Sequence, residues 1–72
     1  MTIEKQLGMR IRYLRTKKHM SQEELSFVSQ VNKNYISDLE RGTRNPTLKV
    51  LEKIAKALEI DLSTLLQGLE TF

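Results

Sequence analysis

The sequence is short of the residues that small proteins use to reinforce a weak core. Its 72 residues include no cysteine, one proline and three glycines. The absence of cysteine excludes disulfides and argues against a structural zinc site. At this length one hydrophobic core contributes only a few kcal/mol, so stability has to come from close helical packing or from a partner chain. We therefore expect one small domain over residues 1–72.

Long apolar runs and strand patterns are also missing. No stretch approaches the roughly 20 apolar residues that a membrane span needs, and the N-terminus lacks the apolar segment of a signal peptide. No segment alternates Val, Ile or Thr with polar residues, which predicts an all-α, cytoplasmic protein without a membrane partner. One histidine, no metal-ligand cluster and no glycine-rich phosphate loop argue against an enzyme, a metal and a cofactor. The chain has no room for a ligand-sensing domain, so we expect no small-molecule ligand.

Positive charge is concentrated near the N-terminus, although the chain as a whole has a net charge of only +3. Within residues 1–20 a single acid, Glu4, accompanies the basic residues Lys5, Arg10, Arg12, Arg15, Lys17 and Lys18. A basic segment favours a polyanionic partner, because binding releases the counterions condensed on phosphates. A solvated helix face is the alternative interpretation, and charge alone does not separate the two.

The spacing of apolar residues predicts helices at both ends of the chain. The first helix, about residues 3–18, has an apolar stripe at Ile3, Leu7, Ile11 and Leu14. A fourth helix follows the N-cap Thr47 and has apolar positions at Leu48, Leu51, Ile54, Ala55 and Leu58. A fifth helix, about residues 61–70, begins at the N-cap Asp61.

Residues 21–42 have the pattern of two short helices joined by a tight turn. Ser21 and Glu24 form a capping box that starts the first of them. Leu25 and Val28 are its inward-facing positions. A helix-turn-helix begins with such a helix, and its second helix must leave one face free for the major groove of DNA.

The second helix of this pair has an apolar inner face and a polar outer face. Asn32 is a suitable N-cap, and Gly42 can end the helix in a left-handed conformation. Val31 fills the core just before the helix, and Ile36 and Leu39 face inward. The side chains left on the outer face are Lys33, Asn34, Ser37 and Asp38.

Three blocks of sequence resemble the lambda-repressor/Cro-like (XRE) helix-turn-helix family. They are S-Q-E-E-L at 21–25, N-Y-I-S-D-L-E-R-G at 34–42 and R-N-P-T-L at 44–48. The resemblance covers about residues 7–66. The short length and the block Y-I-S-D-L-E-R-G-T-R-N-P are similar to controller proteins of restriction–modification systems. The resemblance implies a compact five-helix domain that binds double-stranded DNA as a homodimer, with the third helix in the major groove.

The resemblance also implies which residues contact DNA. The implied set comprises Gln22, Lys33, Asn34, Tyr35, Ser37, Arg41, Arg44 and Asn45. The chemistry of these residues suits the role: Lys33 can donate to guanine O6 or N7, and Asn34 can pair with N6 and N7 of adenine. Arg44 lies on the loop after the third helix, from which its planar guanidinium can reach a phosphate or a guanine.

Three other charged residues have structural interpretations. Asp38 is acidic, so a place on the helix surface or in an intramolecular ion pair suits it better than base reading. Arg15 of the first helix is a candidate partner for Glu40, and Arg41 is another. A pair between Arg15 and Glu40 would be internal, joining the first helix to the third.

Two positions depart from the family pattern. His19, after the first helix, and Gln30, in the turn, stand where many members have glycine. A left-handed backbone at a non-glycine residue costs roughly 1–2 kcal/mol, so the local turn geometry is open at both places.

The C-terminal segment contains more large apolar residues than one short helix can bury on a small core. The candidate dimerisation residues are Leu62, Leu65, Leu66, Leu69 and Phe72. An apolar patch repeated by two-fold symmetry buries itself, and the resulting dimer sets two recognition helices ~34 Å apart. In the alternative, Leu62 and Leu65 complete the core of a single chain.

These features predict a sequence-specific transcriptional regulator that acts as a homodimer on a palindromic operator and controls its own promoter. A phage-type repressor or an antitoxin with the same fold is one alternative. A protein-interaction module that uses the fold without DNA is another. The sequence does not specify the operator, or whether the protein activates or represses.

Overall fold

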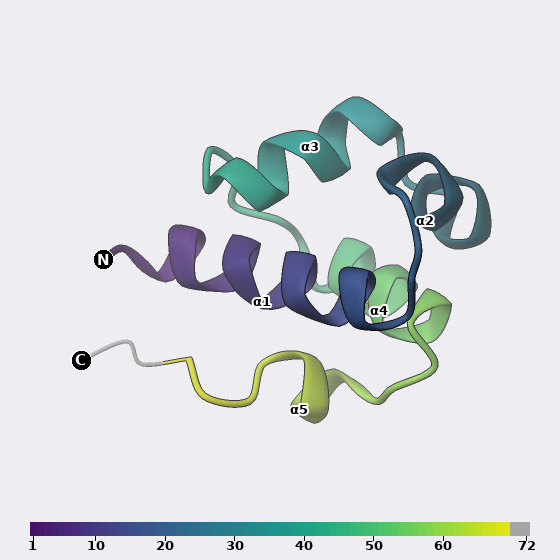
Figure 1. The fold of residues 1–72 in the computed structure, drawn as a ribbon. Coiled ribbons are helices and arrows are strands. Elements are labelled where there is room, and N and C mark those ends of the chain that lie inside the picture. The colour runs from purple at the N-terminus through teal and green to yellow at the C-terminus, as the bar shows by residue number, and fades with distance from the viewer. Residues whose placement is uncertain (70–72) are drawn as a thin grey trace.

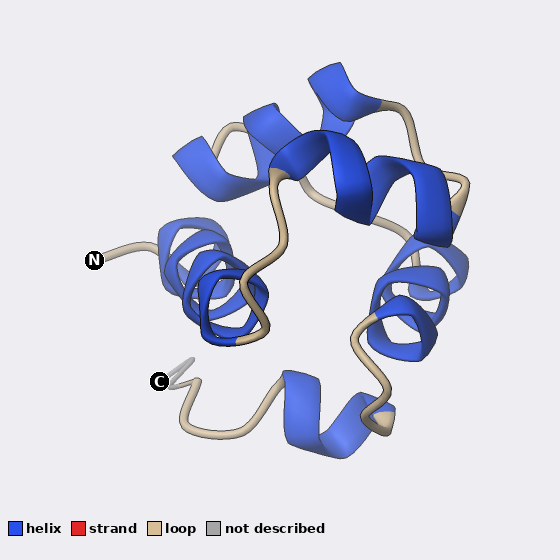
Figure 2. Cartoon of the chain, turned by 45° about the vertical axis from the view of Figure 1, so that its right-hand side comes forward, coloured by secondary structure: helices blue, strands red, loops and turns tan. Residues whose placement is uncertain are grey.

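The computed structural model describes residues 1–69, and its described part is entirely helical (Figure 1). The helices are α1 (Ile3–Lys17), α2 (Gln22–Ser29), α3 (Lys33–Arg41), α4 (Leu48–Ala57) and α5 (Leu62–Leu65). α3 packs on α1 and α2, α2 packs on α4, and α4 packs on α5. The helices are arranged around one hydrophobic core (Figure 2), and α3 and α5 lie on opposite sides of α1 (Figure 1). None of these helices is both long enough and apolar enough to cross a membrane.

The core consists of side chains from every helix and from the turn before α3. Its buried apolar members are Leu7, Ile11, Leu25, Val31, Ile36, Leu39, Leu51, Ile54, Ala55, Ala57, Leu58 and Leu65. Fully burying one Leu or Ile side chain contributes about 1.5–3 kcal/mol, so these few residues carry most of the favourable free energy of folding. The inward positions predicted for α3 are confirmed.

Three positions on the predicted apolar faces are exposed. Val28 is 54% exposed, Leu48 is 71% exposed, and Ile3, the first residue of the stripe predicted for α1, is 36% exposed. α2 buries Leu25 and Ser29, which are four residues apart on one face, so Val28 is turned about 100° away from Ser29. Leu48 is the first residue of α4 and lies nearly one turn before Leu51, where the helix reaches the core.

The predicted N-caps are all present. The Ser21 hydroxyl accepts a hydrogen bond from the Glu24 backbone at 3.0 Å, and the Glu24 carboxylate accepts one from the Ser21 backbone at 2.8 Å. The backbone bond from Ser21 lowers the pKa of Glu24. The other predicted caps are Asn32, Thr47 and Asp61, and Thr2, which was not predicted, caps α1. These side chains satisfy backbone N–H groups that the helices themselves leave free.

Among residues 1–69, three residues other than glycine have a left-handed backbone. His19 and Gln30, the two departures from the family pattern, have φ angles of 59° and 61°. Each costs roughly 1–2 kcal/mol. The Gln30 side chain offsets part of this cost by donating to the Phe27 carbonyl at 2.8 Å. Glu59, at 61°, was not foreseen, and its carboxylate pairs with Lys18.

α5 is shorter than the predicted helix over residues 61–70. It ends at Leu65, and Gly68 follows with a φ of 85°. The Arg10 guanidinium donates to the carbonyls of Thr64 at 2.8 Å and Leu65 at 3.4 Å, so a side chain of α1 satisfies the end of α5. Residue 70 of the predicted helix, and Phe72 of the candidate dimerisation residues, lie outside the described residues.

Candidate nucleic-acid interface

α3 lies at the outer edge of the molecule, with one face in the core and the other toward solvent (Figure 1). Ile36 and Leu39 are fully buried, whereas the Lys33 and Asn34 side chains at the start of the helix are exposed. The Asn34 backbone N–H donates to the Asn32 cap at 2.7 Å. The amphipathic pattern of α3 therefore leaves its first turn open to a partner.

A buried ion pair sets the position of α3 against α1. Arg15 donates from Nε to Glu40 Oε2 at 2.7 Å and from Nη2 to Oε1 at 3.0 Å. Its Nη1 donates to the Met20 carbonyl at 2.7 Å. Gln22, at the start of α2, donates to Glu40 Oε1 at 3.1 Å. One carboxylate thus joins α1, α2 and α3, and the predicted Arg15–Glu40 pair is confirmed.

This pair is almost shielded from water. The exposed fractions are 11% for the Arg15 side chain and 4% for that of Glu40. The hydrogen bond to Glu40 raises the pKa of Arg15, so the guanidinium stays charged. A bidentate arginine–carboxylate pair has a fixed planar geometry, and it therefore holds the helices in one orientation as well as together.

A close backbone contact holds the same, C-terminal end of α3 against α1. A Cβ atom at Gly8 of α1 would overlap the Leu39 carbonyl oxygen and lie 2.7 Å from that of Glu40. Gly42 ends α3 at a φ of 80°, and a Cβ there would lie 2.5 Å from Cγ of Lys5. Sequence reasoning identified Gly42 but missed Gly8, although an isolated glycine inside a helical stripe is a signal for such a contact.

The outer face of α3 and the loop after it contain a second cluster of arginines and a carboxylate. Asp38 pairs with Arg41 and, at 3.3 Å from Oδ2, with Nε of Arg44. Arg41 Nη1 also donates to the Ser37 hydroxyl at 2.9 Å. The Arg44 guanidinium lies 4.5 Å from the centroid of the Tyr35 ring, a cation–π contact. Asp38 makes the intramolecular ion pairs predicted for it, whereas Arg41 pairs with Asp38 and not with Glu40.

Most of the predicted DNA-binding residues lie on α3 and on the loop that follows it. We call this the α3 face, formed by Lys33, Asn34, Tyr35, Ser37, Asp38, Arg41, Arg44 and Asn45. Lys33 is 3.9 Å from the Glu23 carboxylate, a loose and exposed pair. Gln22 lies beside this face, partly buried and bound to Glu40. Within residues 1–69 no group of His, Cys, Asp and Glu is suited to hold a metal ion.

The candidate dimerisation residues divide into two groups. Leu65 has no exposed surface, so it belongs to the core of one chain and is not available to a partner. Leu62, Leu66 and Leu69 are partly buried at the edge of the core. Leu66 and Leu69 line a hollow with Ile3, Leu7, Asn45, Pro46 and Leu51.

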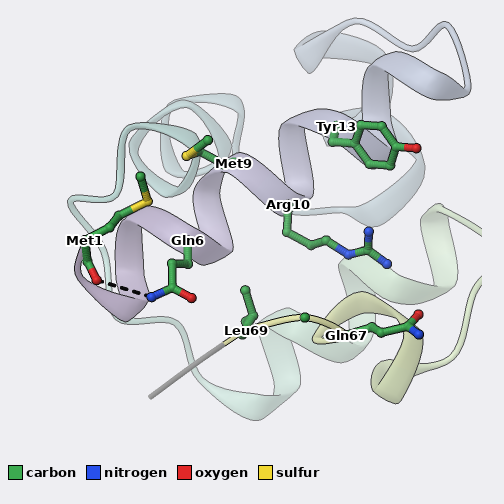
Figure 3. Close-up of a pocket in the computed structure, with 8 residues that line it drawn as sticks. Met1, Gln6, Met9, Arg10, Tyr13, Gln67 and Leu69 are labelled. Carbon is green, nitrogen blue, oxygen red and sulfur yellow. Dashed lines mark hydrogen bonds between the residues drawn. The ribbon is translucent and has the colours of Figure 1, made fainter. Parts of the chain in front are cut away.

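A second hollow lies between α1 and the segment after α5 (Figure 3). Met9 and Tyr13 of α1 are exposed beside it, and Gln6 donates to the Met1 carbonyl at 3.2 Å. Arg10 lies 5.9 Å from the centroid of the Tyr13 ring. Helices α3 and α5 are on opposite sides of α1 (Figure 1), although Asn45, at the end of the α3 face, lines the hollow that contains Leu66 and Leu69.

A family model described as helix-turn-helix, HTH_3, matches residues 11–65. The chain belongs to this family. Control protein C.BamHI from Bacillus amyloliquefaciens is 48% identical over 60 residues, which are 82% of this chain and 74% of that protein. The predicted family is thereby confirmed.

Solved structures of controller proteins share the fold along most of their length. The restriction–modification controller protein C.AhdI from Aeromonas hydrophila has a TM-score of 0.84 and 42% identity, with 86% of this chain and 94% of that chain covered. A tetramer of the controller protein C.Esp1396I in complex with its natural 35 base-pair operator has a TM-score of 0.86 and 35% identity, with 96% and 91% covered. The predicted five-helix, all-α fold is confirmed.

Proposed function

We propose that the protein is a transcriptional regulator that binds a palindromic operator as a homodimer, and that it controls a restriction–modification system and its own promoter from the cytoplasm. The observation that carries the proposal is the α3 face, where exposed Lys33 and Asn34 precede the stacked pair of Tyr35 and Arg44. The operator complex of C.Esp1396I supports it. So does the close match in length to C.AhdI.

The proposed contacts divide into base readers and backbone contacts. Lys33, Asn34 and Ser37 are in the part of α3 that enters the major groove in a helix-turn-helix, where base edges present distinct donors and acceptors. Tyr35 and Gln22 approach phosphates. The contacts made after the end of α3 belong to Arg41, Arg44 and Asn45. Phosphate contacts position the helix, and base contacts select the sequence.

The proposed dimer uses the apolar edge formed by Leu62, Leu66 and Leu69. These residues are partly buried in one chain and gain further burial against a second copy related by a two-fold axis. Helix α3 is on the other side of α1 from α5, so association leaves the first turn of α3 free. Protein concentration then sets activity, because dimerisation and DNA binding are coupled.

Selection of bound fragments from random DNA tests the proposal. We expect enrichment of an inverted repeat whose half-sites are centred about one helical turn apart, about 10 base pairs. Analytical ultracentrifugation of the free protein should show concentration-dependent dimers. Enrichment of no sequence, or a monomer at all concentrations up to tens of micromolar, would contradict the proposed function.

The neighbouring genes separate a controller from a phage-type repressor or an antitoxin. Genes for an endonuclease and a methyltransferase beside this one support a controller, whereas a toxin gene supports an antitoxin. If the protein does not bind DNA even at low salt, a protein-interaction module is supported instead.

A further inference from the structure

Asp38 is an acidic residue in the middle of the α3 face. Its carboxylate accepts hydrogen bonds from Arg41 and from Nε of Arg44. The same two arginines contact Ser37 and Tyr35. A carboxylate at this place opposes the approach of phosphates, so simple attraction to DNA does not account for it.

Two partners hold Arg44 at once. Nε donates to Asp38 at 3.3 Å, and the guanidinium lies over the Tyr35 ring, 4.5 Å from its centroid. Nε is the inner nitrogen of the planar group, so this bond leaves the two terminal nitrogens to other partners. Asp38 and Tyr35 therefore orient the arginine fork before DNA arrives.

The arginines remain accessible although they are paired. The side chains of Arg41 and Arg44 are 62% and 48% exposed, while Asp38 is 25% exposed. Ion pairs at this degree of exposure are weak, so a DNA phosphate competes effectively with the carboxylate for both arginines. The carboxylate nevertheless stays beside them, because its helix is held in the core.

We propose that Asp38 is a specificity-determining residue, which reduces the attraction of Arg41 and Arg44 to phosphates of any sequence and orients Arg44 for its contact with the operator. The proposal rests on the proposed function. On unrelated DNA the two arginines gain only phosphate contacts, and the charge of Asp38 reduces that gain. On the operator, the orientation of Arg44 also strengthens binding, because a side chain that is already oriented loses less entropy when it binds. Asp38 thus weakens binding to unrelated DNA more than binding to the operator.

The test uses the full-length variant Asp38→Asn and two duplexes. One duplex contains the sequence that wild-type protein enriches from random DNA, and the other is a scrambled duplex of the same length and composition. We expect the variant to bind the scrambled duplex about fivefold more tightly, the size of one exposed ion pair. The slope of log K against log salt should steepen by about one. Affinity for the enriched duplex should not rise, so the ratio of affinities should fall about fivefold.

Two further variants show whether the effect acts through the arginines. Glu52→Gln removes an exposed acid from α4 and changes the net charge equally, and it should leave the ratio unchanged. In the double variant Asp38→Asn with Arg44→Ala, part of the gain on scrambled DNA should disappear. The backbone carbonyl of Asp38, which accepts from Thr43 N at 3.0 Å and Oγ1 at 3.1 Å, is unaffected by Asp38→Asn.

The outcomes separate this inference from the proposed function. If wild-type protein prefers its enriched duplex and Asp38→Asn keeps the same ratio, or if Glu52→Gln lowers the ratio as much, the inference alone is overturned. A lower melting temperature with weaker binding to both duplexes shows a merely structural role and also overturns it. Wild-type protein that binds no DNA overturns both.

Discussion

Arginine–carboxylate clusters lie on two sides of α3, and their burial gives them different roles. Glu40 and Asp38 are two residues apart, about 200° around the helix. Glu40 is bound to Arg15 and Gln22 inside the protein. Asp38 is bound to Arg41 and Arg44 in contact with water. The inner cluster is a permanent part of the fold, while the outer cluster can exchange its partners.

The difference follows from the cost of desolvation. A buried charge that loses its partner has no water to replace it, so the inner pair stays intact as long as the protein is folded. An exposed arginine that leaves Asp38 is solvated at once and can bind another anion. The same two residue types therefore fix a helix on one side and present a binding surface on the other. Four predictions follow from this contrast, from the largest expected effect to the smallest.

The largest effect is expected at the inner cluster. Arg15→Ala leaves the buried Glu40 carboxylate without its main partner and should lower the free energy of unfolding by about 3–5 kcal/mol. Urea unfolding followed by circular dichroism measures this. Arg12→Ala, which removes an exposed arginine from the same helix, is the matched control and should change stability little. Equal losses in the two variants would show that the inner pair is no more important than a surface charge.

The next effect is expected where α1 and α3 touch through their backbones. Glycine to alanine inside an exposed helix stabilises by about 1 kcal/mol. Gly8→Ala should instead lower the free energy of unfolding by about 1–3 kcal/mol, because the new Cβ overlaps the carbonyls at the end of α3. Thermal unfolding reads out the sign directly. A higher melting temperature for Gly8→Ala would show that α3 can move away from α1.

At the outer cluster we expect an effect on binding and not on stability. Arg44→Ala should weaken operator binding by at least ~1 kcal/mol and leave the melting temperature nearly unchanged. A gel-shift titration on the enriched duplex measures the affinity. Lys49→Ala removes one exposed positive charge from α4 and serves as the control. The assignment of Arg44 fails if both variants bind as the wild type does.

The smallest effect is expected from an exposed carboxylate at the start of α5. Hydrogen bonds from Thr64 and Ser63 lower the pKa of Asp61 below its ordinary value of 3.8. Its contribution to stability is present above that value and is lost as the pH falls through the lowered pKa. Asp61→Asn keeps a capping oxygen but does not titrate, so its melting temperature should fall less in acid than that of the wild type. Parallel acid profiles would contradict this.

Much of the fold could be predicted because its signals are local. Ser21 with Glu24, Asn32, Thr47 and Asp61 satisfy backbone groups within three residues, so their spacing alone identifies the helix starts. Core positions within the long helices follow from periodicity. Val28 and Leu48 were wrong because α2 is short and α4 begins before it reaches the core, where periodicity does not distinguish inner from outer apolar residues.

The candidate site was predicted as a set of residues but not as an arrangement. Outward positions of α3 follow from its buried ones, which is why Lys33 and Asn34 could be placed. Asp38 and Arg41 are three residues apart on α3, so helical spacing brings them together. The pairing of Arg44 with Asp38 depends on the path of the loop after Gly42. Similarly, the full burial of Leu65 in one chain depends on α5 packing against the rest of the core.

The sequence by itself determined the helix-turn-helix, its caps and the polar face of α3, since these depend on contacts between residues close along the chain. The tertiary structure alone decided that Arg15 and not Arg41 meets Glu40, and where α1 comes close enough to α3 to require a glycine. Such contacts join residues far apart in the chain, and burial then decides whether a pair is permanent or exchangeable. For Glu40 and Asp38, two acids on one helix, that difference comes from the surroundings and not from the residue types.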